Sequence, residues 1–444
     1  MRYLVAILAL LLVAAGVVFS AAGRAAGPVI AITQPARAVG VDGTYGVSVE
    51  SPGGRFSRVE VELEQGSSRV SLFSLVSPGS AVVTQEAADR IRISGALGKR
   101  VIPALQSGAA RLVVRASRPI LFGLRTREAT ASRDLLVVLT PPRISVASMH
   151  HFINQGGAEF VVYRVAPPEV TSGVRVGDRF YAGFPLSGAG APGADPGLKA
   201  AFFALLWNQD LNTPIELYAK DEAGNEAVSR FDHRVFPRPF LSSRIDLTDA
   251  FLQKVVPEIL GQMPDFKTSA GSDADLLQAF LQINRDLRQR NAQQIEALAS
   301  RTAPTMLWKG PFLQLGNSQV ESKFADHRTY FYQGREVDQQ VHLGFDLAVT
   351  ANVPILAEND GVVAFAGYLG IYGNCVIVDH GMGVQSLYGH LSSLDVKAGD
   401  QVEKGRVIGK SGMTGLAGGD HLHFAMLVGG WPVSPVEWWD PHWI

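Results

Sequence analysis

Cysteine is nearly absent from the 444-residue chain, which has one, Cys375. An intrachain disulfide and a thiolate metal cluster are therefore excluded. Cys375 precedes an apolar run at residues 376–378, so we expect a buried structural thiol and not a nucleophile. One cysteine leaves the redox compartment open, because it is compatible with an oxidising or a reducing environment.

Charge is also sparse. Charged residues make up 18% of the chain, and 40 Lys and Arg against 41 Asp and Glu give a net charge of −1. There is no long basic run, so nucleic acid is not expected as a main partner. Hydrophobic residues reach 47%, which is enough to build cores, and the length suits about three domains.

A long apolar run does occur once, at residues 3–22, directly after Arg2. About 20 apolar residues can cross a bilayer as a helix. Small residues follow at positions 20–23, where a signal peptidase can cut. We expect residues 1–26 to be an N-terminal membrane helix that acts as an anchor, with a cleaved signal peptide as the alternative. In either case the remainder is exported.

Two β-rich modules are expected next, at residues 27–140 and 141–236. Short alternating apolar runs between glycine, proline and serine predict β-sandwiches, and one short helix is expected from Gln85 to Ile93. Pro141 and Pro142 mark the boundary. Near the end of the second module, a strand at residues 215–220 precedes an Asp-x-Ala-Gly-Asn turn. This pattern resembles the closing hairpin of bacterial immunoglobulin-like (Ig-like) modules.

Residues 237–305 change to a helical pattern. Leu276, Phe280, Ile283 and Leu287 are spaced four, three and four apart, which is one helix face. An earlier helix is expected to start near Thr248 and to be kinked or ended at Pro257. We interpret the segment as a helical connector. A regulatory or partner-binding helix pair is the alternative.

Residues 306–444 are strand-rich and carry two polar motifs, His342-x-Gly344-x-Asp346 and His421-x-His423. In a strand, alternate residues share a face, so each motif presents its polar groups on one side. Two imidazoles and one carboxylate are a usual protein ligand set for catalytic zinc, with water in the fourth position.

The order of motifs across residues 307–438 resembles the LytM-type, or M23, zinc metallopeptidase family. Between the two polar motifs lie Tyr388-Gly389-His390-Leu391, a Val-Lys-x-Gly-Asp turn at residues 396–400, and Thr414-Gly415. The resemblance implies a β-sheet metallopeptidase domain. It further implies that Zn²⁺ is bound by His342, Asp346 and His423, and that the catalytic residues are His390 and His421.

The resemblance also implies roles for the last two histidines. One would accept the proton of the attacking water and pass it to the leaving amine, and the other would hydrogen-bond the developing oxyanion. The sequence does not say which does which. Two positions beside the site depart from the family pattern: Ala425 stands where an acidic residue is common, and Asp420 where a proline is common.

Together with export, the resemblance implies a zinc-dependent endopeptidase that hydrolyses peptide cross-links or stems of peptidoglycan. No wall-sorting tail or wall-binding repeat is recognisable, so we expect a Gram-negative cell envelope, with the protein anchored in the inner membrane and facing the periplasm, or secreted. One alternative is a non-hydrolytic regulator that activates a cell-wall amidase, although the chain keeps all five site residues. A plain β-barrel binding module is the other, and the ligand triad argues against it.

Several further residues carry weaker expectations. His327 is placed where it could border the cleft, and His380 is read as a turn residue. Trp431, Trp438 and Trp439 are interpreted as packing for the C-terminal strand. The segment at residues 316–332 precedes the first ligand strand, and we hypothesise that it covers the cleft.

Overall fold

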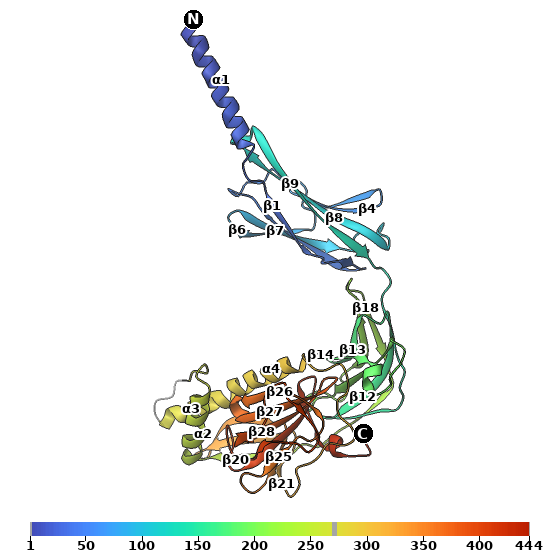
Figure 1. The fold of residues 1–444 in the computed structure, drawn as a ribbon, viewed down its shortest axis with the longest axis vertical. Coiled ribbons are helices and arrows are strands. Elements are labelled where there is room, and N and C mark those ends of the chain that lie inside the picture. The colour runs from blue at the N-terminus through green and yellow to red at the C-terminus, as the bar shows by residue number, and fades with distance from the viewer. Residues whose placement is uncertain (1, 269–272, 444) are drawn as a thin grey trace. The chain divides into compact units, whose positions relative to one another are not determined.

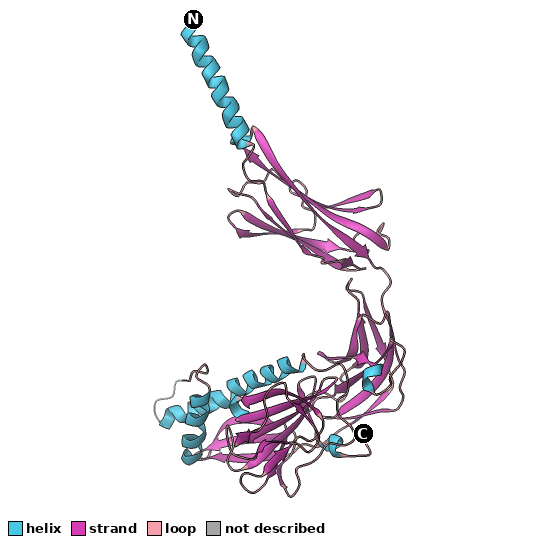
Figure 2. Cartoon of the chain, in the orientation of Figure 1, coloured by secondary structure: helices cyan, strands magenta, loops and turns pink. Residues whose placement is uncertain are grey.

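The computed structural model describes residues 2–268 and 273–443. The chain divides into two compact units, Met1–Pro142 with Lys220–Ala227, and Arg143–Ala219 with Val228–Ile444. Strands dominate and helices are few, which confirms the predicted mainly-β class (Figure 2).

The chain starts with helix α1 (Arg2–Ala22). Among the described residues, no helix has both the length and the apolar character needed to cross a bilayer. A helix is therefore present in the predicted segment 1–26, and its role as an anchor or signal peptide stays a prediction.

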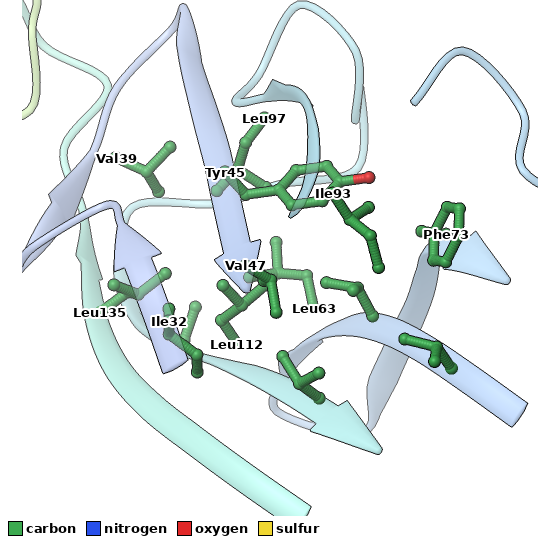
Figure 3. Close-up of a cluster of buried hydrophobic side chains, with 14 of the residues drawn as sticks. Ile32, Val39, Tyr45, Val47, Leu63, Phe73, Ile93, Leu97, Leu112 and Leu135 are labelled. Carbon is green, nitrogen blue, oxygen red and sulfur yellow. The ribbon is translucent and has the colours of Figure 1, made fainter. Parts of the chain in front are cut away.

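The first unit contains two sheets, with strand orders β1-β3-β7-β6 and β2-β9-β8-β4-β5. Alternation decides which side chains meet inside, and Val47, Ile93 and Leu112 are fully buried in the shared core (Figure 3). The strands are β1 (Val29–Gln34), β2 (Ala38–Val39), β3 (Gly43–Glu50), β4 (Arg58–Gln65), β5 (Ser68–Ser74), β6 (Val82–Ala87), β7 (Arg90–Leu97), β8 (Gly108–Ile120) and β9 (Arg125–Val137).

The short helix predicted from Gln85 to Ile93 is wrong. This segment holds the end of β6 and the start of β7, which pair antiparallel. Ile91 and Ile93 both point into the core. Their spacing of two residues fits a strand and not a helix.

The second unit begins with a further set of strands in two sheets, ordered β10-β12-β16-β15 and β14-β13-β17-β18, and a parallel pair of β11 and β19. The predicted strand at residues 215–220 is confirmed as β17. The strands are β10 (Arg143–Val146), β11 (His151–Asn154), β12 (Ala158–Ala166), β13 (Thr171–Val176), β14 (Arg179–Ala182), β15 (Phe184–Pro185), β16 (Leu198–Ala204), β17 (Ile215–Lys220), β18 (Glu226–Arg230) and β19 (His233–Phe236).

The helical segment contains α2 (Asp249–Gln262), α3 (Asp273–Gln282), a π-helical turn (Ile283–Leu287) and α4 (Arg288–Ala299). Thr248 caps α2, because its hydroxyl accepts the Phe251 amide at 3.2 Å. Of the two outcomes predicted at Pro257, a kink or an end of the helix, the end does not occur, because α2 continues to Gln262. Pro257 and Gln253, whose carbonyl loses its helical donor, are both exposed, so water can satisfy that carbonyl.

The remaining strands form a domain around one large sheet, ordered β21-β24-β32-β28-β27-β26-β30, with β33 beside β32. Two small sheets, ordered β20-β22-β23 and β25-β31-β29, complete the set of strands in this part of the chain. The strands are β20 (Ser242–Leu247), β21 (Gln319–Ser322), β22 (Asp326–Tyr332), β23 (Arg335–His342), β24 (Phe345–Ala348), β25 (Pro354–Leu356), β26 (Gly361–Tyr368), β27 (Asn374–Gly381), β28 (Val384–Leu391), β29 (Ser393–Leu394), β30 (Gln401–Val402), β31 (Val407–Lys410), β32 (His421–Val428) and β33 (Trp431–Val433).

Helix α4 covers one face of the large sheet. Ile295 packs into a cluster with Ile377, Leu387, Ala425 and Leu427. Ala425 and Leu427 alternate with the residues of the opposite face, so they share a face with His421 and His423. The helical segment therefore lies on the same side of β32 as the two histidines.

The second β module packs against the large-sheet domain through a buried carboxylate. Glu437 lies in the short helix α5 (Val436–Trp439). Its Oε1 accepts from Asn154 Nδ2 at 2.8 Å and its Oε2 from the Ala158 amide at 2.9 Å. Burial raises the pKa of Glu437. Aromatic contacts between Phe202 and Trp438 add apolar packing beside it.

Candidate metal centre

The pairing of β24 with β32 puts polar side chains from both sequence motifs at one point. Asp346 lies directly opposite His423 in the antiparallel register, and opposite residues in a sheet project from the same face. Asp346 Oδ1 is 3.0 Å from His423 Nδ1. His342, at the end of β23, brings its Nε2 to 2.9 Å from Asp346 Oδ1 and 3.0 Å from His423 Nδ1.

These three donor atoms fit a metal ion. All lie within 4.8 Å of one another and belong to buried residues. His342 Nδ1 contacts the Lys323 carbonyl at 3.2 Å, which holds the proton on Nδ1 and leaves the Nε2 lone pair for a ligand. His423 Nε2 is buried without a hydrogen-bond partner among the described residues. The donor set suits a divalent cation.

Gly344 explains why the first motif has a glycine at its centre. A Cβ at this position would lie 2.5 Å from His423 Cε1 and 2.6 Å from its Nε2. Both distances are too short for carbon and nitrogen atoms that are not bonded. Any other residue at 344 would therefore push the His423 ring out of place.

His390 reaches the site through an unusual backbone conformation. In a regular β28, His390 would point to the same side as Tyr388, away from His423. Its φ of 64° is left-handed, and the ring turns toward the metal-site face, with its centroid 4.8 Å from that of His421 and 5.7 Å from that of His423. A non-glycine residue in this region stores strain, and such strain concentrates at functional sites.

His421 completes the set of five predicted site residues. Its Nε2 is 3.5 Å from Asp346 Oδ1. Its Nδ1 contacts the Gly419 carbonyl at 2.9 Å, and His390 Nδ1 contacts the Thr414 carbonyl at 2.8 Å. Each ring thus keeps a proton on Nδ1, which leaves a free Nε2 lone pair on His390, whereas His421 Nε2 faces the Asp346 carboxylate. The structure brings all five residues together around one cleft of about 650 Å³.

Burial and mutual contacts shift the pKa values of the clustered side chains in the directions that favour binding of a cation. Burial alone would raise the pKa of Asp346, but its contacts with His342, His421 and His423 hold that pKa well below the usual range. Burial lowers the pKa of His423 to about 4. Burial and the neighbouring histidines lower the pKa of His390 as well. The charged Asp346 carboxylate beside the neutral His423 imidazole is the protonation state that metal binding requires.

Arg328 holds the second oxygen of the Asp346 carboxylate and was not anticipated from the sequence. Its Nη2 donates to Asp346 Oδ2 at 2.8 Å and to Ser322 Oγ at 2.7 Å. Ser322 Oγ lies 3.1 Å from His342 Nδ1. The Arg328 guanidinium therefore supports Asp346 directly and His342 through Ser322. The alternation of Asp326, Arg328 and Tyr330 along β22 was the signal that could have placed Arg328 on this face.

The helical segment forms one wall of the cleft, and no sequence signal indicated this. Thr248, Phe251 and Lys254 of the α2 region line the cleft. Glu258 accepts the Gly415 amide at 2.8 Å, which ties α2 to the loop before His421. The segment at residues 316–332, hypothesised to cover the cleft, instead contains β21 and β22, and Glu321, Arg328 and Tyr330 line the cleft from it.

Two weaker expectations for histidines are wrong. His327 faces away from the cleft, because it alternates with Asp326 and Arg328, and its ring packs against Trp207. His380 is no turn residue. It is fully buried in β27, where it contacts the Asp360 carbonyl at 2.7 Å and Ser386 Oγ at 2.7 Å.

The packing role expected of the three C-terminal tryptophans is confirmed. Trp438 is fully buried, and Trp439 stacks on Phe424 behind the metal-site strand. Trp431 lies under the Arg179 guanidinium. Ala425, which departs from the acidic residue common in the family, packs beneath Ile295, where a charge would be buried without a partner.

Comparisons with known proteins agree with the motifs. The family model described as Peptidase family M23 matches residues 340–435. The DD-carboxypeptidase/endopeptidase Mpg of Neisseria meningitidis serogroup B is 43% identical over 98 residues, which are 22% of this chain and 23% of that protein. The peptidoglycan DD-endopeptidase ShyA of Vibrio cholerae is 38% identical over 96 residues, 22% of each chain.

The chain matches less than a quarter of the length of either curated relative. Among solved structures, a putative peptidase M23 from Pseudomonas aeruginosa is 22% identical, with a TM-score of 0.37, covering 63% of this chain and 92% of that one.

Strain at His390 predicts an unusual response to substitution. Asparagine tolerates the left-handed conformation better than most residues, and its amide can still donate to the Thr414 carbonyl. We expect His390→Asn to leave the free energy of unfolding unchanged or to raise it by up to about 1 kcal/mol. His421→Asn, in regular strand conformation, is the matched control and should lose about 1 kcal/mol. Urea unfolding measures both free energies. If His390→Asn lost as much unfolding free energy as His421→Asn, the backbone at His390 would not be strained.

The Arg328 brace predicts a defect in metal affinity. Arg328→Met removes the charge-assisted hydrogen bond to Asp346 Oδ2 and frees the carboxylate to rotate. Losing such a supporting contact typically weakens metal binding about 10- to 100-fold. Competition with a chromophoric chelator measures the affinity, and Arg335→Met, on an exposed position of β23, is the control. Equal affinity in both variants would show that Arg328 does not position the ligand.

Proposed function

Because the C-terminal domain of this chain is a Peptidase family M23 domain, we propose that the protein is a zinc-dependent endopeptidase that hydrolyses peptide cross-links or stems of peptidoglycan. The convergence of His342 Nε2, Asp346 Oδ1 and His423 Nδ1 within 3.0 Å of one another carries the proposal. The names of the relatives, a DD-carboxypeptidase/endopeptidase and a peptidoglycan DD-endopeptidase, support the substrate class.

His342, Asp346 and His423 would hold the zinc ion. Two imidazole nitrogens and one carboxylate oxygen leave a fourth position open, as catalytic zinc sites do. When bound, zinc lowers the pKa of a water ligand toward about 7 and polarises the scissile carbonyl. Arg328 and Lys323 orient the ligands through the contacts described above, so the donor atoms need little rearrangement on binding.

His390 and His421 would do the proton chemistry. Backbone carbonyls hold a proton of each ring on Nδ1, so Nε2 is the atom through which each ring would exchange a proton with the substrate. One ring takes the proton of the attacking water and delivers it to the leaving amine. The other, once protonated, donates to the oxygen that gains charge. Their ring centroids lie 4.8 Å apart, close enough to serve the same peptide bond.

The cleft suits an extended peptide that carries charged groups. Its walls combine the cationic Lys254 and Arg328 with the apolar Phe251, Tyr330 and Ile371. A peptidoglycan stem has backbone amides, carboxylates and methyl groups, which these walls complement. We place this activity in the cell envelope, at the periplasmic side of the inner membrane, in keeping with the exported chain expected after residues 1–26.

Cleavage of purified, cross-linked muropeptides by the zinc-loaded full chain tests the proposal. Mass spectrometry should detect the separated stems. His390→Ala and His421→Ala should each lower the rate by about 100-fold or more, the range for a lost general acid or base. His442→Ala, at an exposed position near the C-terminus, should keep the rate. A zinc-loaded protein that cleaves no peptidoglycan but stimulates a cell-wall amidase would favour the regulator alternative.

The two histidines of the last motif should differ in metal content. His423→Ala removes a ligand, so zinc and activity should fall together. His421→Ala keeps all three donor atoms and should retain most of its zinc while losing turnover. Metal analysis after dialysis measures the split. An equal loss of zinc in both variants would contradict this division of roles.

A further inference from the structure

The hairpin of β8 and β9 ends in a turn that presents apolar side chains to solvent. The two strands are 13 residues long each. At the turn, the exposed fraction of Phe122 is 101% and that of Leu124 is 80%. Exposed apolar side chains that lie together are a feature of surfaces that contact membranes or partners.

The backbone of the turn is strained at Leu121 and Phe122. Leu121 has a φ of 50° and Phe122 a φ of 54°. Bulky residues rarely adopt this left-handed conformation, which glycine would adopt without strain. Leu121 and Phe122 therefore carry a conformational free-energy cost that glycine would avoid, and such strain is concentrated at functional sites.

Three arginines surround the base of this turn. Arg118 lies directly opposite Arg127 in the hairpin register, and Arg125 opposite Ile120. Like charges directly across a ladder destabilise it. Arg118 donates to the Pro52 carbonyl, Arg125 Nη1 to the Phe19 carbonyl at 2.8 Å, and Arg127 Nε to the Ala25 carbonyl at 3.0 Å. Carbonyl partners leave the positive charges in place, so the base of the turn is cationic.

The turn continues the apolar surface of α1. The Arg125 guanidinium lies 4.9 Å from the centroid of the Phe19 ring, and Figure 1 shows the end of the hairpin beside the C-terminal end of α1. The apolar side chains that α1 exposes include Leu11, Leu12, Val13, Val17, Val18 and Phe19.

We propose that the turn at residues 121–124 is a lipid-contacting surface. Phe122 and Leu124 enter the acyl region of a bilayer, while Arg118, Arg125 and Arg127 contact the phosphates of anionic phospholipids. In a bilayer the apolar acyl chains lie below the anionic headgroups. The apolar tip of the turn would therefore meet the acyl chains while its cationic base meets the headgroups. The contact holds the β-sandwich of the first unit at the membrane surface and does not depend on the proposed enzymatic activity.

Brominated lipids test this contact, because bromine on the acyl chain quenches tryptophan only within the bilayer. The six native tryptophans all lie at positions 207–443, outside the sandwich, so an added one reports on it. The full-length chain carries Phe122→Trp or, as matched control, Val76→Trp at a turn after β5 where the exposed fraction is 94%. Each is reconstituted in vesicles of phosphatidylethanolamine and brominated phosphatidylglycerol.

The fluorescence added by Phe122→Trp should be largely quenched, and that added by Val76→Trp should not, relative to the unsubstituted chain. Both variants contain α1, so insertion of α1 alone cannot produce the difference. Equal quenching of both, or of neither, would overturn the proposal. Equal thermal unfolding of the two variants in detergent confirms that each is folded.

Discussion

The antiparallel register between β24 and β32 is the constraint on which the site depends. It sets Asp346 opposite His423, so a carboxylate and an imidazole from sequence segments about eighty residues apart share one face. A slip of one residue would turn His423 to the other side and bring Leu422 or Phe424 in its place. The buried apolar residues of the far face, Phe424 against Tyr388 and Trp439, make that slip costly and so hold the donor atoms in place.

The same face of β32 carries two kinds of contact along its length. Near its start it holds His421 and His423, and farther along Ala425 and Leu427 lie under α4. Helical residues thus exclude water from the sheet beside the site and supply a wall of the cleft. A buried, low-dielectric setting strengthens the charge interactions within it, and at Asp346 the contacts with the three histidines outweigh burial and depress the pKa.

The predictable part of the fold came from local alternation. The alternation along β32 places His421 and His423 on one face. The spacing of Phe280, Ile283 and Leu287 predicts a buried helix face, and all three side chains are buried. The helix expected from Gln85 to Ile93 was wrong because polar residues masked a spacing of two between Ile91 and Ile93. Pro257 stayed within α2 because the carbonyl it leaves free is at the surface.

The site was harder to predict where it departs from regular geometry. Strand alternation alone puts His390 on the wrong face, and only its left-handed backbone brings the ring to the cleft. The α2 wall depends on tertiary contacts between segments far apart in sequence, such as that of Glu258 with the Gly415 amide, which no local pattern encodes. His390 was nonetheless identified from the sequence, because the Tyr388-Gly389-His390-Leu391 motif resembles that of the family and does not depend on strand alternation.

X-ray absorption at the zinc edge of the metal-loaded protein tests the central claim most directly, namely that His342, Asp346 and His423 hold one zinc ion with a position left for water. The spectrum should fit two imidazole nitrogens at about 2.0–2.1 Å and two oxygens at about 2.0–2.2 Å. The imidazole count should stay at two in His390→Ala and in His421→Ala, which both keep the three proposed ligands. A site of three or four imidazoles in the unsubstituted protein would contradict the account, because His390 or His421 would then be a ligand and unavailable for proton transfer.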